Sequence, residues 1–529
     1  MTETPAPDAA ATAPADPIVE AVRPGYAFEG PALELGGLML DAENLSDVHI
    51  RIPLGMLNRH GLVAGATGTG KTKTLQLLAE QLSANGVPVF AADIKGDLSG
   101  LSTLGETNEK ITARAGSVGQ TWEAKGFPVE YFALGGQGTG ITLRATMTSF
   151  GPTLLSKVLG LNDTQESSLG LIFHYADERG LPLLDLADLR AVVHHLNSDE
   201  GKPELKELGG LSSATAGVIL RELIAFEQQG ADAFFGEPEF DTKDFLLTTS
   251  DGKGVISLVE LPNLQDRPAV FSTFLMWLLA DLFHDLPEVG DPEKPSLVFF
   301  FDEAHLLFAD ASKDFLQAIT QTVRLIRSKG VGVFFVTQSP TDVPDDVLAQ
   351  LGSRVQHQLR AATPNDAKAL KATVNTYPTS AYDDLGKVIL SLGIGEAIVT
   401  VMNERGAPTP VAWTRLRAPE SLMAPADPAA MDAAVKGSPL FAKYAEEVDR
   451  ESAYEKLTKK VEEGAAKAEK ETADAEAKGE KVPYPKKSST KARKDDSLIV
   501  DVVNSRAGRE VLRTAAREIV RGVFGIGRR

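Results

Sequence analysis

Short apolar runs alternate with amphipathic segments along most of the chain. Residues 61–64 are a continuous apolar run that a Gly-rich turn connects to the helix-period segment 74–82, and a second apolar run follows at 87–93. A strand, a helix and a strand within so short a stretch form a βαβ unit, which implies parallel strands joined by a right-handed crossover.

Further apolar runs resume after residue 250 and predict more strands of the same sheet. They lie at 255–260, 297–302, 331–338 and 354–360, with helix-period segments at 269–282 and 315–327 between them. Uninterrupted apolar runs, rather than alternating ones, are typical of strands that helices cover on both faces. The pattern therefore predicts an α/β fold with a mainly parallel, doubly wound sheet.

Composition divides the rest of the chain into segments. Residues 26–417 are expected to form one domain, with a small β element before residue 60 and a mainly helical insertion over about 95–250. The other expected segments are a disordered lead at 1–25, an Ala/Pro-rich linker at 418–450, a charged low-complexity segment at 451–495 that is an exposed helix or disordered, and a basic amphipathic C-terminal helix at 496–529.

The residue types and segments that the sequence lacks exclude several classes of protein. The 529 residues include no cysteine, which excludes a disulfide scaffold, a thiolate zinc site, an iron–sulfur cluster and a cysteine nucleophile. No apolar run approaches the ~20 residues that span a membrane, and the N-terminus lacks the features of a signal peptide. We therefore expect a cytoplasmic protein with no integral membrane association.

A phosphate-binding loop is the strongest chemical signal. The pattern G-x-x-x-x-G-K-[ST] falls between an apolar strand and a helix, where glycines let backbone N–H groups and the helix N-terminus face a phosphate. We expect Lys71 to reach the β- and γ-phosphates of ATP and Thr72 to offer its hydroxyl to Mg²⁺. The expected nucleotide-binding residues are Gly65, Ala66, Thr67, Gly68, Thr69, Gly70, Lys71 and Thr72.

Two acids end a later apolar strand, and an amide ends the next one. Asp302 and Glu303 follow the run 297–301. An aspartate there can hold the water shell of Mg²⁺, and the adjacent glutamate can polarise an attacking water. Gln338 follows the next strand and could orient that water, since neighbouring parallel strands end at the same edge of a sheet.

Arginines near this edge are candidates for a group that acts on the nucleotide of a neighbouring subunit. An arginine supplied in trans stabilises the charge on the transferring phosphate and makes hydrolysis depend on assembly. Arg324 and Arg327 are candidates, and Arg354 and Arg360, which flank the predicted strand 354–360, are the preferred pair.

Four motifs together carry a resemblance to a known family. They are the phosphate loop, Asp-Ile-Lys-Gly-Asp at 93–97, Phe-Phe-Phe-Asp-Glu-Ala-His at 299–305 and Val-Thr-Gln-Ser-Pro at 336–340. The combination resembles the FtsK–HerA superfamily of ring ATPases, and more closely the bacterial HerA-like helicase family. The likeness covers roughly residues 26–417.

The resemblance implies a RecA-like ATPase core, homo-hexameric rings, ATP and Mg²⁺ as cofactors, and DNA translocation driven by hydrolysis. It assigns catalytic roles to Lys71, Glu303 and Gln338 and metal binding to Thr72 and Asp302. One departure concerns partners. HerA has an N-terminal β-barrel that recruits a nuclease, whereas only about 60 residues precede the phosphate loop here, which argues against a nuclease partner.

Charge is distributed unevenly along the chain. The net charge is −19, yet residues 481–529 contain 13 Lys and Arg against 5 Asp and Glu. That basic segment could dock on a protein surface, bind nucleic acid or bind an anionic membrane. DNA contact in the acidic remainder would need a local basic lining.

Three functions remain open on the sequence alone. The first is a Mg²⁺-dependent ATPase motor that moves DNA through a ring. The second is a nucleotide-switched assembly or scaffold ATPase that moves nothing. The third is a metabolic kinase, for which no pocket for an acceptor substrate stands out.

Overall fold

The structure is a computed structural model that describes residues 16–136, 138–207, 210–261, 268–308, 313–378, 380–448 and 450–477. The chain divides into two compact units. Unit 1 contains residues 1–146, 153–162 and 225–448, and unit 2 contains residues 147–152, 163–224 and 449–529. The chain therefore passes from unit 1 into unit 2 and back twice before residue 449.

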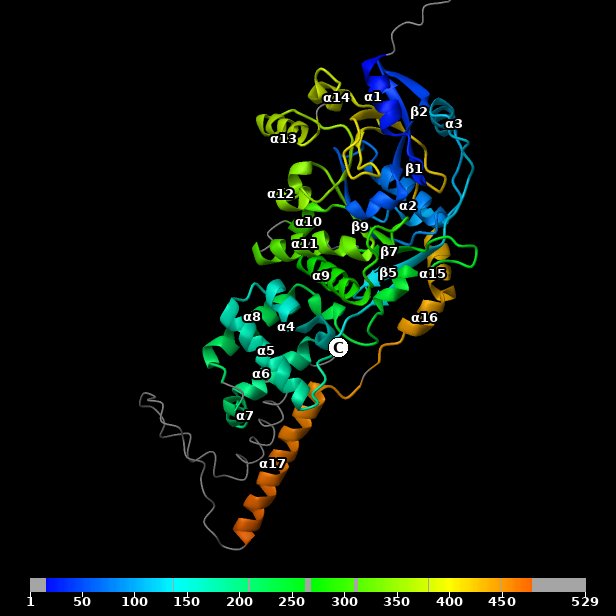
Figure 1. Ribbon diagram of the computed structural model, residues 1–529. Helices are drawn as coiled ribbons and strands as arrows, with labels where there is room; N and C mark the ends of the chain where they lie inside the picture. Colours follow the sequence, from blue (N-terminus) through cyan, green and yellow to red (C-terminus); the bar gives the residue numbers. More distant parts are fainter. Residues whose placement is uncertain are drawn as a thin grey trace, which may run out of the picture. The chain divides into compact units, whose positions relative to one another are not determined.

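Unit 1 is built on one 12-stranded sheet of order β2-β1-β12-β11-β10-β3-β9-β8-β4-β7-β5-β6 (Figure 1). From β10 to β6 neighbouring strands are parallel, whereas β2, β1, β12 and β11 pair antiparallel. The predicted mainly parallel α/β sheet is confirmed. The strands are β1 Ala32–Leu40, β2 Glu43–Pro53, β3 Gly61–Ala64, β4 Val89–Asp93, β5 Val129–Leu134, β6 Ile141–Leu143, β7 Ile256–Glu260, β8 Leu297–Phe301, β9 Val331–Thr337, β10 Ser353–Gln356, β11 Glu396–Thr400 and β12 Ala412–Leu416.

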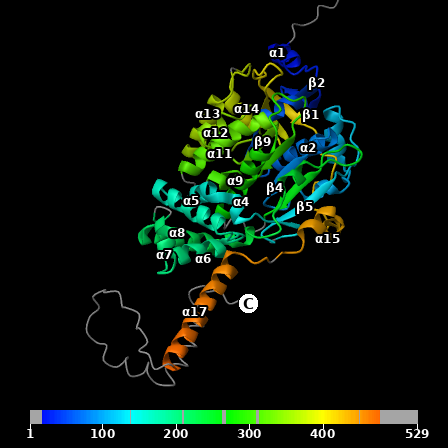
Figure 2. The same ribbon diagram turned by 60° about the horizontal axis from the view of Figure 1, so that its bottom comes forward.

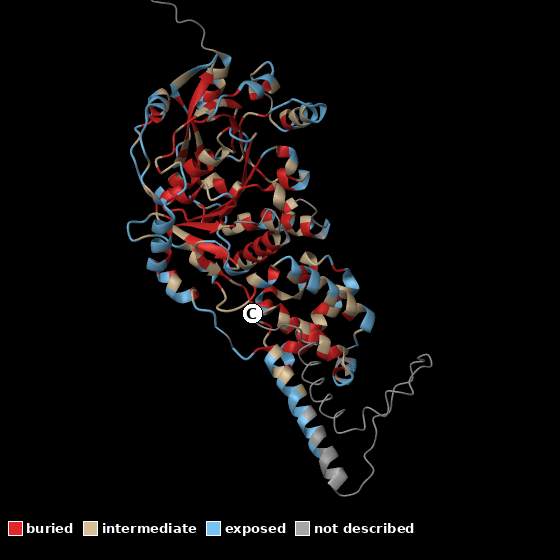
Figure 3. Ribbon diagram, turned by 180° about the vertical axis from the view of Figure 1, so that it is seen from behind, coloured by how far each residue is buried: buried red, intermediate tan, exposed pale blue. Residues whose placement is uncertain are grey.

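Helices cover both faces of this sheet. The helix α2 (Lys71–Ala84) lies on one face, and α9 (Pro268–Asp285) and α11 (Lys313–Ile326) lie on the other (Figures 1 and 2). Every residue of β4, β8 and β9 is consequently buried, which explains why these strands are apolar without alternation (Figure 3). Aromatic rings fill this core: the centroid of Phe90 lies 4.9 Å from that of Phe299, which stacks on Phe301.

Several shorter helices complete unit 1. The kinked helix α4 lies at the chain's first exit from unit 1 and has residues in both units. The bounds are α1 Pro17–Gly25, α3 Glu109–Ser117, α4 Met147–Val158, α10 His305–Phe308, α12 Asp345–Leu348, α13 Pro364–Asn375, α14 Leu385–Ser391, α15 Pro428–Gly437 and α16 Pro439–Tyr444.

The predicted segments need four corrections. Residues 17–25 form α1, which the Asp16 side chain caps, rather than a disordered lead; residues 1–15 lie outside the described residues. The region 95–250 is only partly a helical insertion, because it supplies β5 and β6 to the sheet. The predicted strand 354–360 ends at Gln356, and β11 and β12 follow it unpredicted.

The predicted linker 418–450 is the fourth correction, because much of it is part of unit 1. Gln76, on α2, donates hydrogen bonds to the Ser421 hydroxyl at 2.6 Å and the Leu422 carbonyl at 3.0 Å. The buried carboxylate of Glu80 accepts hydrogen bonds from the backbone N–H groups of Glu420 and Ser421. Residues 420–422 are thereby bound to the helix that begins at the phosphate loop.

Unit 2 is helical. Its helices are α5 Asp163–Glu178, α6 Leu186–Asn197, α7 Gly201–Glu207, most of α8 Ser213–Gln228, and α17 Ala453–Ala477. The carboxylate of Asp188 accepts hydrogen bonds from the N–H groups of Leu184 and Tyr454, both at 2.8 Å, and so joins α6 to the start of α17. The charged segment predicted at 451–495 therefore begins as a helix, whereas the basic helix predicted at 496–529 lies outside the described residues.

Among the residues described, no helix has the length and apolar character needed to cross a membrane.

The close approach of β1 and β12 predicts a strong effect of replacing Gly36. A Cβ at this position would lie 1.9 Å from the carbonyl oxygen of Arg415. We expect Gly36→Ala to lower the free energy of unfolding of unit 1 by about 1–3 kcal/mol, because the strands must separate. Tryptophan fluorescence during urea unfolding reports this, since Trp122, Trp277 and Trp413 all belong to unit 1.

Gly437→Ala is the matched control. An added Cβ there meets no heavy atom within 4 Å, so we expect a change within about 0.5 kcal/mol. Equal losses in the two variants would contradict the packing argument.

Candidate nucleotide-binding site

The phosphate loop turns directly out of β3 into α2. Gly68 (φ 83°) and Gly70 (φ 113°) adopt backbone conformations that side chains disfavour. Gly65 is needed for a different reason: a Cβ there would lie 2.5 Å from the Cβ of His357. The loop is also joined to its neighbours, because the N–H of Gly65 donates to Thr337 and that of Ala66 to Gln358. This turn leaves the N-terminal end of α2 free to face an anion.

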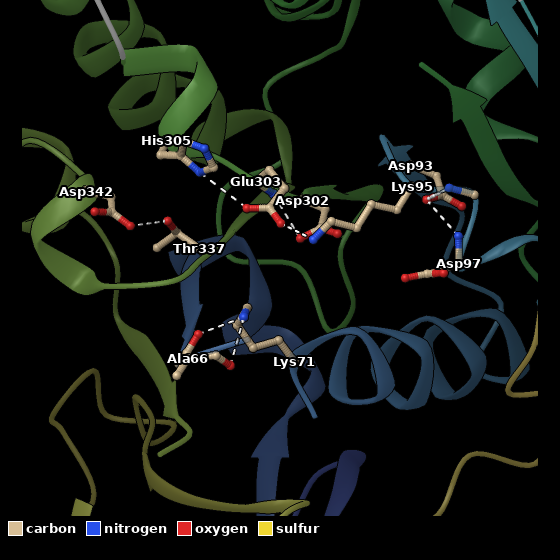
Figure 4. Close-up of polar contacts among 12 residues, drawn as sticks. Ala66, Lys71, Asp93, Lys95, Asp97, Asp302, Glu303, His305, Thr337 and Asp342 are labelled. Carbon is tan, nitrogen blue, oxygen red and sulfur yellow. Dashed lines mark hydrogen bonds and ion pairs between the residues drawn. The ribbon is translucent and has the colours of Figure 1, made fainter. Parts of the chain in front are cut away.

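The ammonium group of Lys71 lies inside this loop. It donates to the carbonyl oxygens of Gly65 at 2.7 Å and Ala66 at 3.3 Å (Figure 4). Burial lowers the pKa of Lys71, while the carboxylates of Glu303 and Asp302 oppose that shift. The ammonium is therefore placed to exchange its contacts with these carbonyl oxygens for contacts with phosphate oxygens. Thr72 follows in the first turn of the same helix.

The two acids follow β8, which β9 separates from β3 in the sheet. Asp302 and Glu303 are both only 4% exposed. Burial, and then the charge of Glu303, raises the pKa of Asp302 to about 6. A buried carboxylate beside another carboxylate is an oxygen ligand whose negative charge Mg²⁺ would stabilise. The carboxylate of Asp302 therefore fits the expected metal, whereas a second protein oxygen from Thr72 stays a prediction.

Gln338 completes the edge of the sheet. It follows β9, the strand that lies between the phosphate loop and the acids, and its side chain helps to lower the pKa of Glu303. Thr337 before it donates to Asp342 at 2.7 Å, which holds the end of the strand. The structure thus brings the phosphate loop, Asp302, Glu303 and Gln338 to one edge, as the parallel order of the strands predicts.

Two further side chains contact Glu303, and neither was among the predicted site residues. Lys95, which follows β4, forms an ion pair with one carboxylate oxygen, and the His305 ring nitrogen Nδ1 lies 3.3 Å from the other (Figure 4). Burial alone would raise the pKa of Glu303, but Lys95 and then His305 hold it below its usual value. The signal that could have revealed Lys95 is its position in the sequence, two residues after a buried strand of the same sheet.

A buried histidine packs against the phosphate loop and the first turn of α2. The ring of His357 is fully buried, and its Nε2 atom lies 2.8 Å from the hydroxyl of Thr74 on α2. Burial, with the charge of Lys71, lowers the pKa of His357 to about 4, so the ring is neutral at physiological pH. Sequence reasoning missed His357, because the sequence alone does not distinguish a histidine after a strand from one that only packs in the core.

The structure does not bring the preferred arginines together. The guanidinium of Arg360 lies 3.4 Å from the Thr67 carbonyl, on this chain's own loop. Arg354 instead aligns with Leu62 of β3, donates to the Thr376 carbonyl at 2.9 Å and lies 5.9 Å from the Tyr377 ring centroid.

Arg354 lines a cavity of about 570 Å³ together with Arg59, Arg324 and Arg327. The surrounding segments precede β3, β9 and β10, so this cavity lies toward the amino ends of strands whose carboxyl ends form the nucleotide site. The expected position of Arg324, Arg327 and Arg354 at the active edge is therefore wrong.

A Gly-rich loop between a central parallel strand and a helix, with an acid pair two strands away, defines the class of P-loop ATP hydrolases. The chain belongs to the helicase HerA-like C-terminal family, which matches residues 39–529. The resemblance seen in the sequence motifs is confirmed.

Solved structures give weaker likenesses. The bacterial conjugative coupling protein TrwBΔN70 is 16% identical, with a TM-score of 0.49 and coverage of 77% of this chain and 93% of its own. VirB4 of Thermoanaerobacter pseudethanolicus is 15% identical, with a TM-score of 0.45 and coverage of 74% and 97%. TrwB in complex with ADP and Mg²⁺ is 16% identical, with a TM-score of 0.49 and coverage of 76% and 98%. Curated protein sequences gave no significant match.

Replacing Lys71 should separate nucleotide binding from folding. We expect Lys71→Ala to weaken ATP binding by about tenfold to a hundredfold, because one charge-assisted contact to phosphate is lost. Titration calorimetry measures the affinity. Lys73→Ala is the control, since its ammonium donates to the Met423 carbonyl at 2.7 Å rather than to the loop. An equal loss in both variants would show a general effect on α2.

The pKa of Asp302 predicts how metal binding depends on pH. Below about pH 6 the carboxyl is protonated, so Mg²⁺ must displace a proton. We expect the Mg²⁺-dependent gain in nucleotide affinity to be constant above pH 7 and to fall about tenfold per pH unit well below 6. Asp302→Asn removes the titrating group, so an unchanged pH dependence in this variant would show that another group causes it.

Proposed function

We propose that this protein is a Mg²⁺-dependent ring ATPase that hydrolyses ATP to move along DNA. The observation that carries the proposal is the meeting of Lys71, the acid pair and Gln338 at the ends of β3, β8 and β9. Membership of a helicase-like family supports nucleic acid as the polymer that is moved.

Each residue of the site has a separate role in hydrolysis. Mg²⁺, held by Asp302 and Thr72, would neutralise charge on the β- and γ-phosphates. Backbone N–H groups of the loop and the ammonium of Lys71 bind the phosphates once they replace the Gly65 and Ala66 carbonyls. Glu303 accepts the proton of the attacking water, and Gln338, which helps to lower the pKa of Glu303, orients that water.

A ring would give the arginine-lined cavity a role. Its four arginines lie toward the opposite ends of the strands from the chain's own phosphate loop, so they suit contact with the nucleotide of a neighbouring subunit. Arg324 is free of ion pairs among the described residues, whereas Arg59 and Arg327 share Asp291 at 3.5 and 3.4 Å. This arrangement supports a homo-hexamer in which assembly completes the site. The need for ATP supports action in the cytoplasm.

Hydrolysis with and without polymer tests the proposal. We expect ATP turnover by the purified chain to require Mg²⁺ and to rise when double-stranded or single-stranded DNA is added. Glu303→Gln should lower turnover by about a hundredfold or more while ATP binding is retained, because only the proton acceptor is lost. A coupled phosphate-release assay measures the rate, and mass photometry with nucleotide measures the ring.

The results separate the motor from a scaffold ATPase. Turnover that is indifferent to DNA and RNA would contradict the motor, and a ring that forms with ATP but is not stimulated would favour the nucleotide-switched scaffold. The Lys71→Ala variant provides the baseline for contaminating ATPases, since it should neither bind ATP tightly nor respond to DNA.

A further inference from the structure

One oxygen of the proposed proton acceptor is engaged by a lysine in this structure, and the other is buried without a hydrogen-bond partner. Oε1 of Glu303 accepts a hydrogen bond from the ammonium of Lys95, and Oε2 lies 3.3 Å from Nδ1 of His305. The side chain of Glu303 is only 5% exposed. A carboxylate takes a proton from water only through a lone pair that faces the water, so the ion pair at Oε1 and the burial of Oε2 withhold the base.

The loop that carries Lys95 is held firmly, whereas its side chain is not. The buried Asp93 carboxylate accepts hydrogen bonds from the N–H groups of Gly96 at 2.8 Å, Asp97 at 3.2 Å and Leu98 at 2.8 Å. These bonds fix the backbone on both sides of Lys95. The Lys95 side chain is 41% exposed, so the ammonium can leave Glu303 for water without a rearrangement of the sheet.

Glu303 itself has a backbone that favours a defined orientation. Its φ of 49° is a left-handed conformation that a glutamate rarely adopts, and its N–H accordingly donates to Asp302 at 2.9 Å. The backbone at 303 is thus set by local geometry, and the side chain is directed by Lys95 and His305. Lys71 does not compete for this carboxylate, because it donates to the carbonyls of its own loop.

We propose that Lys95 is a positioning residue that restrains Glu303 in the resting enzyme, so that release of this ion pair precedes hydrolysis. In the hydrolytic step the water oxygen bonds to the γ-phosphorus, the bond to the β–γ bridging oxygen breaks, and the water proton passes to Glu303. While Lys95 occupies Oε1, the carboxylate is both misdirected and a weaker proton acceptor. The inference rests on the proposed role of Glu303 as the base.

Steady-state ATP hydrolysis without any nucleic acid tests the restraint. We expect Lys95→Met to raise kcat about threefold to tenfold, with KM for ATP changed by less than about twofold, because the restraint acts on the base rather than on nucleotide binding. Lys95→Arg keeps the charge and should stay near the wild-type rate. A simple loss of packing would not raise kcat while leaving KM unchanged.

Lys443→Met is the matched control for removing an ion pair. Lys443 pairs with Asp244 at 2.8 Å, and its side chain is 49% exposed, close to the exposure of Lys95. We expect no rise in kcat for this variant. Lys95→Gln is the second variant if Lys95→Met does not fold, as judged by thermal unfolding.

The double variant Lys95→Met/Glu303→Gln shows whether the effect passes through Glu303. We expect it to be as inactive as Glu303→Gln alone. A tenfold or greater fall in kcat in Lys95→Met would instead place Lys95 on the transferring phosphate, and an unchanged kcat would show that the pair restrains nothing. Either result overturns the inference. Failure of DNA to stimulate the wild type would contradict the motor but not a raised basal rate in Lys95→Met.

Discussion

Parallel pairing of β3, β9, β8 and β4 is the constraint on which the rest of this structure depends. Neighbouring parallel strands end at the same edge, so the pairing of Ala64 with Thr337 and of Phe301 with Phe335 and Ala92 delivers four different loops to one place. Helices on both faces exclude water from the strands, which is why the strands can be apolar throughout. Polar chemistry is thereby confined to the residues immediately after each strand.

That confinement places charges where water is scarce. Asp302 and Glu303 are nearly buried, and carboxylates in such a place are stable only with positive partners or metal beside them. Lys95 supplies the partner for Glu303, whereas the pKa of Asp302 stays raised because burial outweighs the nearby positive charge. The same electrostatic need thus explains the ion pair of Lys95 with Glu303 and supports the proposed binding of Mg²⁺ at Asp302.

The helix that starts at the phosphate loop is supported from both sides. His357 packs against Gly65 and contacts Thr74, so the loop approaches a neighbouring strand too closely for any side chain at Gly65. On its other side, Gln76 binds the segment that follows β12. The loop and its helix are therefore held by residues 283 and 345 positions away in the sequence. Motif patterns cannot reveal contacts over such separations.

The sequence by itself determined the central parallel strands, the phosphate loop and the acids and amide that follow the strands, because continuous apolar runs and glycine spacing are local consequences of a buried sheet and a tight turn. It misassigned β5, β6 and most of the predicted linker 418–450, whose places depend on distant partners. Only the tertiary structure decided which cations face Glu303 and placed Arg354 toward the opposite ends of the strands. Ion pairs and strand order are settled by contacts between segments far apart in the chain, and these leave no local pattern.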